Sequence, residues 1–376
     1  MFFYLSLFLL FIAIYKWAEL DGRWWTLLIA ILVPTLFEGL RDEFVGEDML
    51  GYGSEWFYSM NEDEGLMNIL ESAQTPEYAY HLLIYLCKKI SQDINVFMTA
   101  CALIKITAVT LFVYRMRELL SSFLILFSYY CFFYVTSFSM MRQGIAVAIC
   151  IYSLYYLSNK DILRFLPTVI IAYFFHNSAI LMLLIIPVYY MRNLKYKYFI
   201  ILGSIVFVYL SIEFLFELVL MTPLFKSGMA DLYMDSGVPS AKTNILIALI
   251  FMGYGIYYHY FEEKEFEEVE FEEVEFDEEE FEEEKSDERP YLLMISSAMT
   301  LLFLLLSSYI EVAFRMSYYM FIVSTAIVVM FISNSEQYRY ERFASFTALF
   351  LLHFYIDCEH GASGALDYSS SILGII

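Results

Sequence analysis

The sequence predicts an all-α fold: a polytopic integral membrane helical bundle of about 11–13 transmembrane or half-membrane helices. Two observations support this prediction. Apolar residues occupy 60% of the 376 positions, and they include 36 Phe and 33 Tyr. Crossing a hydrocarbon core takes roughly 20 helical residues, and apolar runs of about that length recur from residue 2 to residue 357.

The runs place the predicted spans in chain order. They lie near residues 2–18, 24–40, 95–113, 119–137, 144–158, 163–175, 178–190, 198–220, 244–261, 291–309, 317–333 and 344–357. The first run has no basic region and no small-residue cleavage site before or after it, which favours a span over a removable signal. The runs 163–175 and 178–190 are short and predict a helical hairpin that turns at His176-Asn177-Ser178. Segment 77–90 is short and amphipathic; a re-entrant or interfacial helix is favoured, and a full span stays open.

The distribution of Lys and Arg predicts the orientation of these spans. With the N-terminus outside, the inner loops hold 14 basic residues and the outer side holds 7. Positive residues in short loops favour the cytoplasm. The chain is then expected to form a single transmembrane domain over residues 1–376, with an extracytoplasmic loop at 41–76. The turns near Arg142, His176 and Arg315 fall on the same outer side, which predicts that these polar groups form one site.

An acidic segment interrupts this pattern at residues 261–290. Its phenylalanines recur every five residues, and residues 262–288 alone carry 18 of the 44 acidic side chains. A period of five builds neither a helical stripe nor one strand face. We expect a cytoplasmic insertion that is disordered or weakly helical, with a cation buffer or a partner tether as the less favoured functional role.

The remaining composition excludes several function classes. Without the acidic segment the charges nearly balance, and no basic patch predicts nucleic-acid binding. There is no phosphate-binding loop, zinc-protease motif or dinucleotide fingerprint. The five cysteines lack metal-ligand spacing. The sequence therefore predicts no metal and no cofactor.

Two candidate residues belong to the outer loop and its entrance. Arg41 ends the second span, and its planar fork of donors suits a phosphate or carboxylate, although a snorkelling helix-end arginine is the plainer interpretation. Asp48 follows in Gly46-Glu47-Asp48 as a candidate base or sugar-hydroxyl acceptor. We assign substrate binding to Arg41 and a catalytic role to Asp48.

Two further motifs open or close apolar runs. Arg142-Gln143-Gly144 begins a span, where a charge is costly unless it is paired or faces water. His176-Asn177 marks the hairpin turn, where an imidazole can exchange a proton near neutral pH. We predict Arg142 and His176 as catalytic residues, and Gln143 and Asn177 as substrate-binding residues.

The late motif and one mid-span lysine complete the set. Arg315 is followed by Tyr318 and Tyr319, whose rings and hydroxyls suit sugars, while Glu311 offers a local ion pair. Arg315 is predicted to be catalytic, and the two tyrosines to bind substrate. Lys105 lies within a span and is the feature that a transporter's proton relay would need.

Taken together, these motifs resemble a known family. Gly39-Leu40-Arg41, Gly46-Glu47-Asp48, Arg142-Gln143-Gly144-Ile145-Ala146, His176-Asn177-Ser178-Ala179 and Arg315 with its tyrosines are similar, in order and rough spacing, to motifs of the EpsG-like branch of Wzy-type polysaccharide polymerases. Each motif is short, and only their joint order is specific. The resemblance covers most of the chain outside 261–290.

The resemblance implies a membrane glycosyltransferase of surface-polysaccharide assembly in the bacterial inner (plasma) membrane. Such an enzyme joins oligosaccharide repeat units carried on undecaprenyl pyrophosphate at the periplasmic or outer face. Membrane lipids are further expected partners, with chain-length regulators or flippase proteins as candidates. Two alternatives stay open: a lipid-linked glycan flippase or transporter, and a lipid-linked glycan ligase.

Overall fold

The computed structural model confirms the all-helical prediction. It describes residues 1–375 except 47–48, 50–52, 62, 64, 73–76, 192–193, 195, 197–198, 201–202, 204–206, 208–209, 212–240, 259–288, 308–310, 335–338, 361–363 and 366. Within these residues every regular element is a helix, and one isolated antiparallel bridge joins Ser370 to Ile375. The predicted span 198–220 and the acidic repeat lie largely or wholly outside the described residues.

The chain is a multi-pass membrane protein. Four described helices are long and apolar enough to cross a bilayer: Phe2–Asp21, Ile94–Met116, Arg289–Leu306 and Ala313–Asn334. Five shorter apolar helices accompany them: Trp24–Gly39, Ser122–Tyr134, Ile162–Phe175, Asn177–Met191 and Lys242–Tyr257.

The described residues divide into two compact units, and each is presented by itself. The first unit comprises 1–183 and 329–376, and the second comprises 184–328. The predicted single domain and the sidedness of the loop 41–76 stay predictions.

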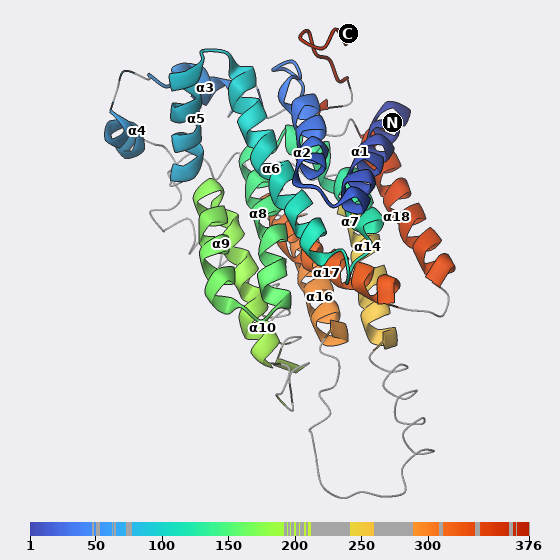
Figure 1. The fold of residues 1–376 in the computed structure, drawn as a ribbon. Coiled ribbons are helices and arrows are strands. Elements are labelled where there is room, and N and C mark those ends of the chain that lie inside the picture. The colour runs from blue at the N-terminus through green and yellow to red at the C-terminus, as the bar shows by residue number, and fades with distance from the viewer. Residues whose placement is uncertain are drawn as a thin grey trace, which may run out of the picture. The chain divides into compact units, whose positions relative to one another are not determined.

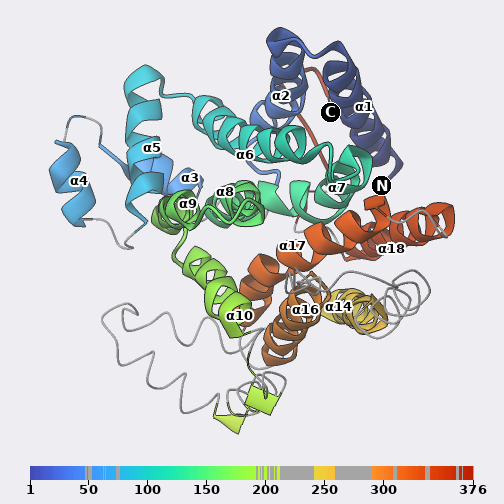
Figure 2. The ribbon, with the colours of Figure 1, turned by 60° about the horizontal axis from the view of Figure 1, so that its bottom comes forward.

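The first unit is built on a row of packed helices. In this row α1 (Phe2–Asp21) packs on α2 (Trp24–Gly39), α2 on α6 (Ile94–Met116), α6 on α8 (Met141–Ser158), and α8 on α9 (Ile162–Phe175). Figure 2 shows this row from α1 to α9. Close approach of α2 and α6 requires a small residue, because a Cβ on Gly39 would lie 2.5 Å from the Thr99 Cα.

Short helices occupy the end of the first unit where α2 finishes and α6 begins. They are α3 (Ser54–Ser59), α4 (Leu66–Ser72) and α5 (Tyr78–Ile90), which Figure 1 shows in light blue and teal. Lys88 of α5 ties α3 down: its ammonium donates to the Met60 carbonyl at 2.5 Å and lies 5.3 Å from the centre of the Phe57 ring. The amphipathic helix predicted at 77–90 therefore forms, packed against α3, α6 and α9.

The span predicted at 119–137 is not one continuous α-helix. It consists of α7 (Ser122–Tyr129), a π-helical turn at Tyr130–Tyr134 and a 3-10 turn at Thr136–Phe138. At its irregular end the Ser137 carbonyl accepts from Lys105 of α6, and the Phe138 carbonyl accepts from Arg41, which follows α2. Non-helical backbone at membrane depth is tolerated where protein groups satisfy it in this way.

The C-terminal residues return to the end of α2. Tyr368 stacks on Phe37 at 4.1 Å between ring centres, and its hydroxyl donates to the Phe37 carbonyl at 2.6 Å. The Asp42 amide donates to the Ser369 carbonyl at 2.9 Å, and the Ser371 amide donates to the Asp42 carboxylate at 2.9 Å. The last described residues thereby fasten the start of the loop that follows α2.

The second unit contains α10 (Ile185–Met191), α14 (Ala241–Tyr257), α16 (Arg289–Leu306) and most of α17 (Glu311–Asn334). Serine hydroxyls connect α16 to α17, because Ser324 donates to Ser296 at 2.8 Å and Ser297 donates to Ser324 at 3.3 Å. The Tyr291 hydroxyl donates to the Val188 carbonyl at 3.2 Å and joins α16 to α10. The remaining predicted span, at 344–357, forms within α18 (Arg339–Glu359) in the first unit.

Candidate functional site

A single carboxylate, that of Glu77, joins the two predicted motifs of the first unit. Its Oε2 accepts a charged hydrogen bond from Arg142 Nη1, and its Oε1 lies 2.5 Å from His176 Nδ1. These three residues come from the start of α5, the start of α8 and the end of α9. The structure thus brings together Arg142 and His176 through an acid that lies 65 and 99 residues away from them in the sequence.

Local backbone structure fixes Glu77 in this place. It is the residue before α5, and its carbonyl accepts from the amides of Tyr80 at 3.0 Å and His81 at 3.3 Å. The side chain is 3% exposed, whereas those of Arg142 and His176 are 16% and 21% exposed. The acid is therefore covered, and its two basic partners keep access to the outside of the protein.

Glu77 is ionised in this setting. Burial opposes the charged form, but the hydrogen bond and charge of His176, together with Arg142, outweigh it and lower the pKa of Glu77 to about 2. An ionised carboxylate between two bases sets both their positions and their hydrogen-bonding roles.

His176 occupies the turn predicted from the sequence. Helix α9 ends at Phe175, His176 is extended at φ −156° and ψ 123°, and the 3-10 helix Asn177–Leu184 follows. The His176 amide still donates to the Ala172 carbonyl at 3.0 Å, and its own carbonyl accepts from the Ala179 amide at 3.0 Å. The break after α9 therefore leaves the imidazole partly exposed while the amide and carbonyl of His176 keep their hydrogen bonds.

Aromatic rings flank Arg142. Its guanidinium carbon lies 4.6 Å from the centre of the Trp56 ring and 6.0 Å from that of Tyr80. Trp56 also contacts His81, whose ring stacks on the indole at 4.7 Å with an interplanar angle of 17°. Burial lowers the pKa of His81 and keeps that imidazole neutral. The loop 41–76 thus contributes Trp56 to the support of Arg142.

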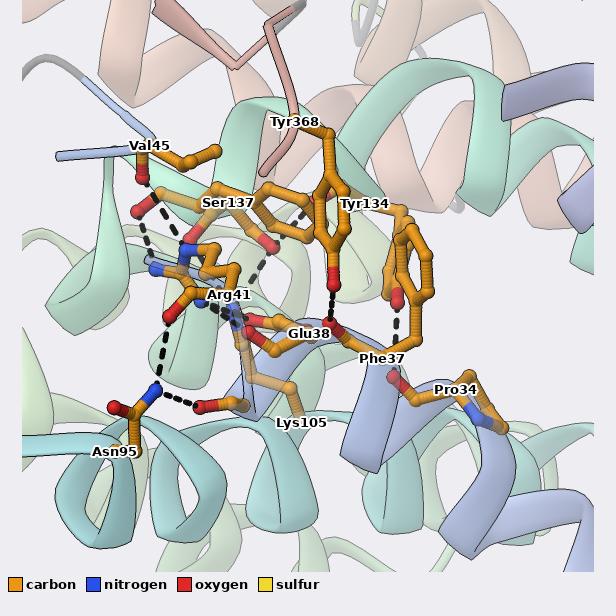
Figure 3. Close-up of polar contacts among 12 residues, drawn as sticks. Pro34, Phe37, Glu38, Arg41, Val45, Asn95, Lys105, Tyr134, Ser137 and Tyr368 are labelled. Atoms are coloured by element: carbon orange, nitrogen blue, oxygen red, sulfur yellow. Dashed lines mark hydrogen bonds and ion pairs between the residues drawn. The ribbon is translucent and has the colours of Figure 1, made fainter. Parts of the chain in front are cut away.

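A second polar cluster lies deeper in the same unit, and Figure 3 shows it. Lys105 of α6 donates to the Glu38 carboxylate of α2, to the Ser137 carbonyl at 3.1 Å and to the Ser137 hydroxyl at 2.9 Å. Lys105 and Glu38 are 0% and 1% exposed. The mid-span lysine noted in the sequence is therefore fully enclosed and paired.

Arg41 belongs to this second cluster. Its guanidinium donates to the backbone carbonyls of Glu38 at 2.7 Å, Phe138 at 2.9 Å and Val45 at 3.2 Å, and it lies over the Phe138 ring. The side chain is 0% exposed. In this structure Arg41 stabilises the chain where it leaves α2, but its head is enclosed by protein and does not reach water as a snorkelling arginine would. Substrate binding by Arg41 stays a prediction that these contacts do not support.

Gln143 and Asn177, which were predicted to bind substrate, lie next to Arg142 and His176 in the sequence. Gln143 is buried at 3% exposure on α8, and Asn177 is half-buried beside His176. Gly144 packs against the second cluster, because a Cβ there would lie 2.9 Å from the Ser137 Cβ and 3.2 Å from the Lys105 Cδ. In the Arg142-Gln143-Gly144 motif, Arg142 therefore belongs to the candidate site with Glu77, and Gly144 permits close packing on the second cluster.

The late motif lies in the second unit. Arg315 is half-buried on α17, and Tyr318 and Tyr319 are 3% and 0% exposed. Their assignment to the site stays a prediction. Asp48 and the side chain of Glu311 lie outside the described residues. Among the described residues, no group of three or more His, Cys, Asp or Glu side chains could hold a metal ion.

Sequence reasoning missed Glu77 and Glu38. Glu77 is the first residue of the segment predicted at 77–90, one position beyond the loop whose acids were weighed. Glu38 is an acid inside the predicted span 24–40, and Lys105 is a base inside the span 95–113. The rule that a charge in a span needs a partner would have marked both residues as requiring one, without showing that they pair with each other.

Comparison with known proteins agrees with the motifs. Neither the curated proteins nor the solved structures compared with this chain gave a match. The profile of the EpsG family matches residues 24–370, which include both polar clusters. The chain is a member of the EpsG family of membrane proteins linked to polysaccharide biosynthesis.

Proposed function

We propose that the protein is a membrane glycosyltransferase that polymerises undecaprenyl-pyrophosphate-linked oligosaccharide units, with its site on the outer face of the bacterial inner (plasma) membrane. The observation that carries this proposal is the junction of Arg142 and His176 on Glu77. It gives one end of the first unit a partly exposed cation and a partly exposed proton acceptor side by side.

The chemistry requires both groups. In the transfer, the bond between the sugar C1 and the pyrophosphate oxygen breaks, and the hydroxyl oxygen of the acceptor unit forms a new bond to C1. Negative charge grows on the departing pyrophosphate, which a fixed guanidinium stabilises. The proton of the acceptor hydroxyl moves to the imidazole of His176. The lipid-linked donor is already activated, so the reaction uses no nucleotide.

The flippase alternative receives less support. The feature that a transporter's proton relay would need is Lys105, the charge within a span. Lys105 is 0% exposed and is held by Glu38 and Ser137. A charge enclosed in this way has no access to the outside of the protein, with which a relay would exchange protons.

Alanine variants of Arg142, His176 and Arg315 test the proposal in cells that make the glycan. We expect each to leave single repeat units on the lipid or acceptor and no long polymer, because the transfer step is lost while supply continues. Arg164→Ala is the matched control, since Arg164 is 72% exposed and pairs only with nearby Asp161 among its described contacts. The readout is glycan size, with the amount of folded protein measured for each variant.

Normal chain lengths in all three variants would reject the polymerase. Loss of all surface glycan, including single units, would instead indicate a flippase.

A further inference from the structure

We infer that Glu77 is a positioning residue that holds His176 in the tautomer carrying the proton on Nδ1, so that Nε2 accepts the proton of the acceptor hydroxyl, and that the same carboxylate orients Arg142. This inference rests on the proposed function and assigns a role to a residue that no motif of the sequence includes. Glu77 contacts Arg142 and His176, and it acts through them rather than on the substrate.

The contacts determine which imidazole nitrogen is available. His176 Nδ1 lies 2.5 Å from the Glu77 Oε1, and a carboxylate that is ionised can only accept a hydrogen bond. Nδ1 must therefore carry the proton and donate it. In the neutral ring Nε2 then has its lone pair exposed, which is the form that a general base needs.

The two carboxylate oxygens divide their tasks. Oε2 accepts from Arg142 Nη1, while Oε1 faces His176. A carboxylate that binds both groups fixes the separation between the charge that stabilises the leaving group and the base that receives the proton. Because Glu77 is 3% exposed, water does not compete for either oxygen.

The surrounding helices hold the Glu77 side chain in one position. The backbone of Glu77 starts α5, and α5 packs on α9, the helix that ends at His176. The titratable groups near Glu77 and His176 among the described residues include Arg142 from α8 and both Tyr80 and His81 from α5. The Trp56 ring contacts both His81 and Arg142.

Glu77→Gln tests the inference because the amide keeps the shape of the side chain and removes its charge. General-base catalysis raises a reaction rate by about 10²–10⁴-fold, so we expect the polymerisation rate per folded protein to fall about 100-fold. The acid limb of the pH–activity profile should also move to lower pH, because without the neighbouring carboxylate the protonated imidazole is less stabilised. Glu77→Asp should recover part of the rate, since it restores the charge at a shorter reach.

A double variant separates positioning from packing. If Glu77 acts through His176, then adding Glu77→Gln to His176→Ala should lower the residual activity far less than the single change lowers that of the unmodified protein. Folded protein is quantified for each variant, so a loss of folding is not scored as a loss of activity. A pH profile that stays in place in Glu77→Gln, or full activity per folded protein, would overturn the inference.

The outcomes for the two proposals are distinguishable. Loss of polymer in Arg142→Ala and His176→Ala, with an unchanged rate and pH profile in Glu77→Gln, rejects the positioning role and leaves the polymerase standing. Normal polymer in all of these variants rejects the polymerase as well.

Discussion

Two clusters in the first unit have the same parts and different surroundings. In each, one carboxylate serves two basic side chains: Glu38 serves Lys105 and Arg41, and Glu77 serves Arg142 and His176. The bases of the first cluster are 0% exposed, and those of the second are 16% and 21% exposed. A charged side chain in a membrane helix is therefore not by itself evidence of a functional site. What distinguishes the two clusters is whether their basic side chains are exposed.

The covered cluster holds helices together. Glu38 joins α2 to α6 through Lys105, and Arg41 ties the end of α2 to the irregular end of the α7 segment. Tyr80 is buried beside the accessible cluster, with its ring centre 6.0 Å from the Arg142 guanidinium carbon.

Breaking the covered pair should have the largest effect on stability. Lys105→Met leaves Glu38 buried and charged with only Arg41, 4.0 Å from its carboxylate, as a cation, and removing one partner of a buried pair costs about 3–5 kcal/mol of unfolding free energy. We expect a large loss of folded protein, measured as thermal unfolding in detergent. The double variant Glu38→Gln with Lys105→Met should recover part of the stability, because it removes the buried carboxylate and the lysine together, while Arg41 keeps its three backbone carbonyl acceptors. A single variant as stable as the double variant would contradict the assignment of a scaffold role.

Acid should affect the accessible cluster through Glu77. The pKa of this carboxyl is lowered from 4.5 to about 2, so its ionised form stabilises the folded state fully above pH 4.5 and this contribution is lost as the pH falls towards 2. The contribution is at most about 3 kcal/mol. Glu77→Gln should flatten this part of the stability curve, measured as unfolding temperature against pH. An identical acid slope in the variant and the unmodified protein would show that other groups produce it.

Gly144 offers the smallest and most local test. An added Cβ would press on Ser137 and Lys105, and overpacking of this kind costs about 1–3 kcal/mol. Gly144→Ala should lower the unfolding temperature without removing any site residue. Gly253→Ala in α14 is the control, because a Cβ there meets no atom within 4 Å and replaces a flexible helix residue. Equal stability in the two variants would mean that α8 does not pack closely on the covered cluster.

Much of the fold could be predicted because long apolar runs in the sequence indicate membrane helices. The turn at His176 was predicted because two short runs flank it, and the structure confirms the break between Phe175 and Asn177. Arg142 was singled out because it opens a span. The role of Arg41 could not be read in the same way, since its acceptors are backbone carbonyls, which every sequence contains.

The acids that complete both clusters needed the structure. Glu77 lies 65 residues before Arg142, and Glu38 lies 67 residues before Lys105, so no local spacing connects either pair. Their partnership depends on which helices pack side by side. A sequence shows that a charged residue needs a partner, and only packing shows which residue supplies it.

The most direct test compares the glycan made by one variant from each cluster, per folded protein. Arg142→Lys keeps a cation for Glu77 but loses the planar fork, and we expect it to leave mainly single repeat units. Glu38→Gln with Lys105→Met is expected to make polymer of normal length on whatever fraction folds. Long polymer from Arg142→Lys, together with single units from the folded double variant, would contradict the division of the two clusters into site and scaffold.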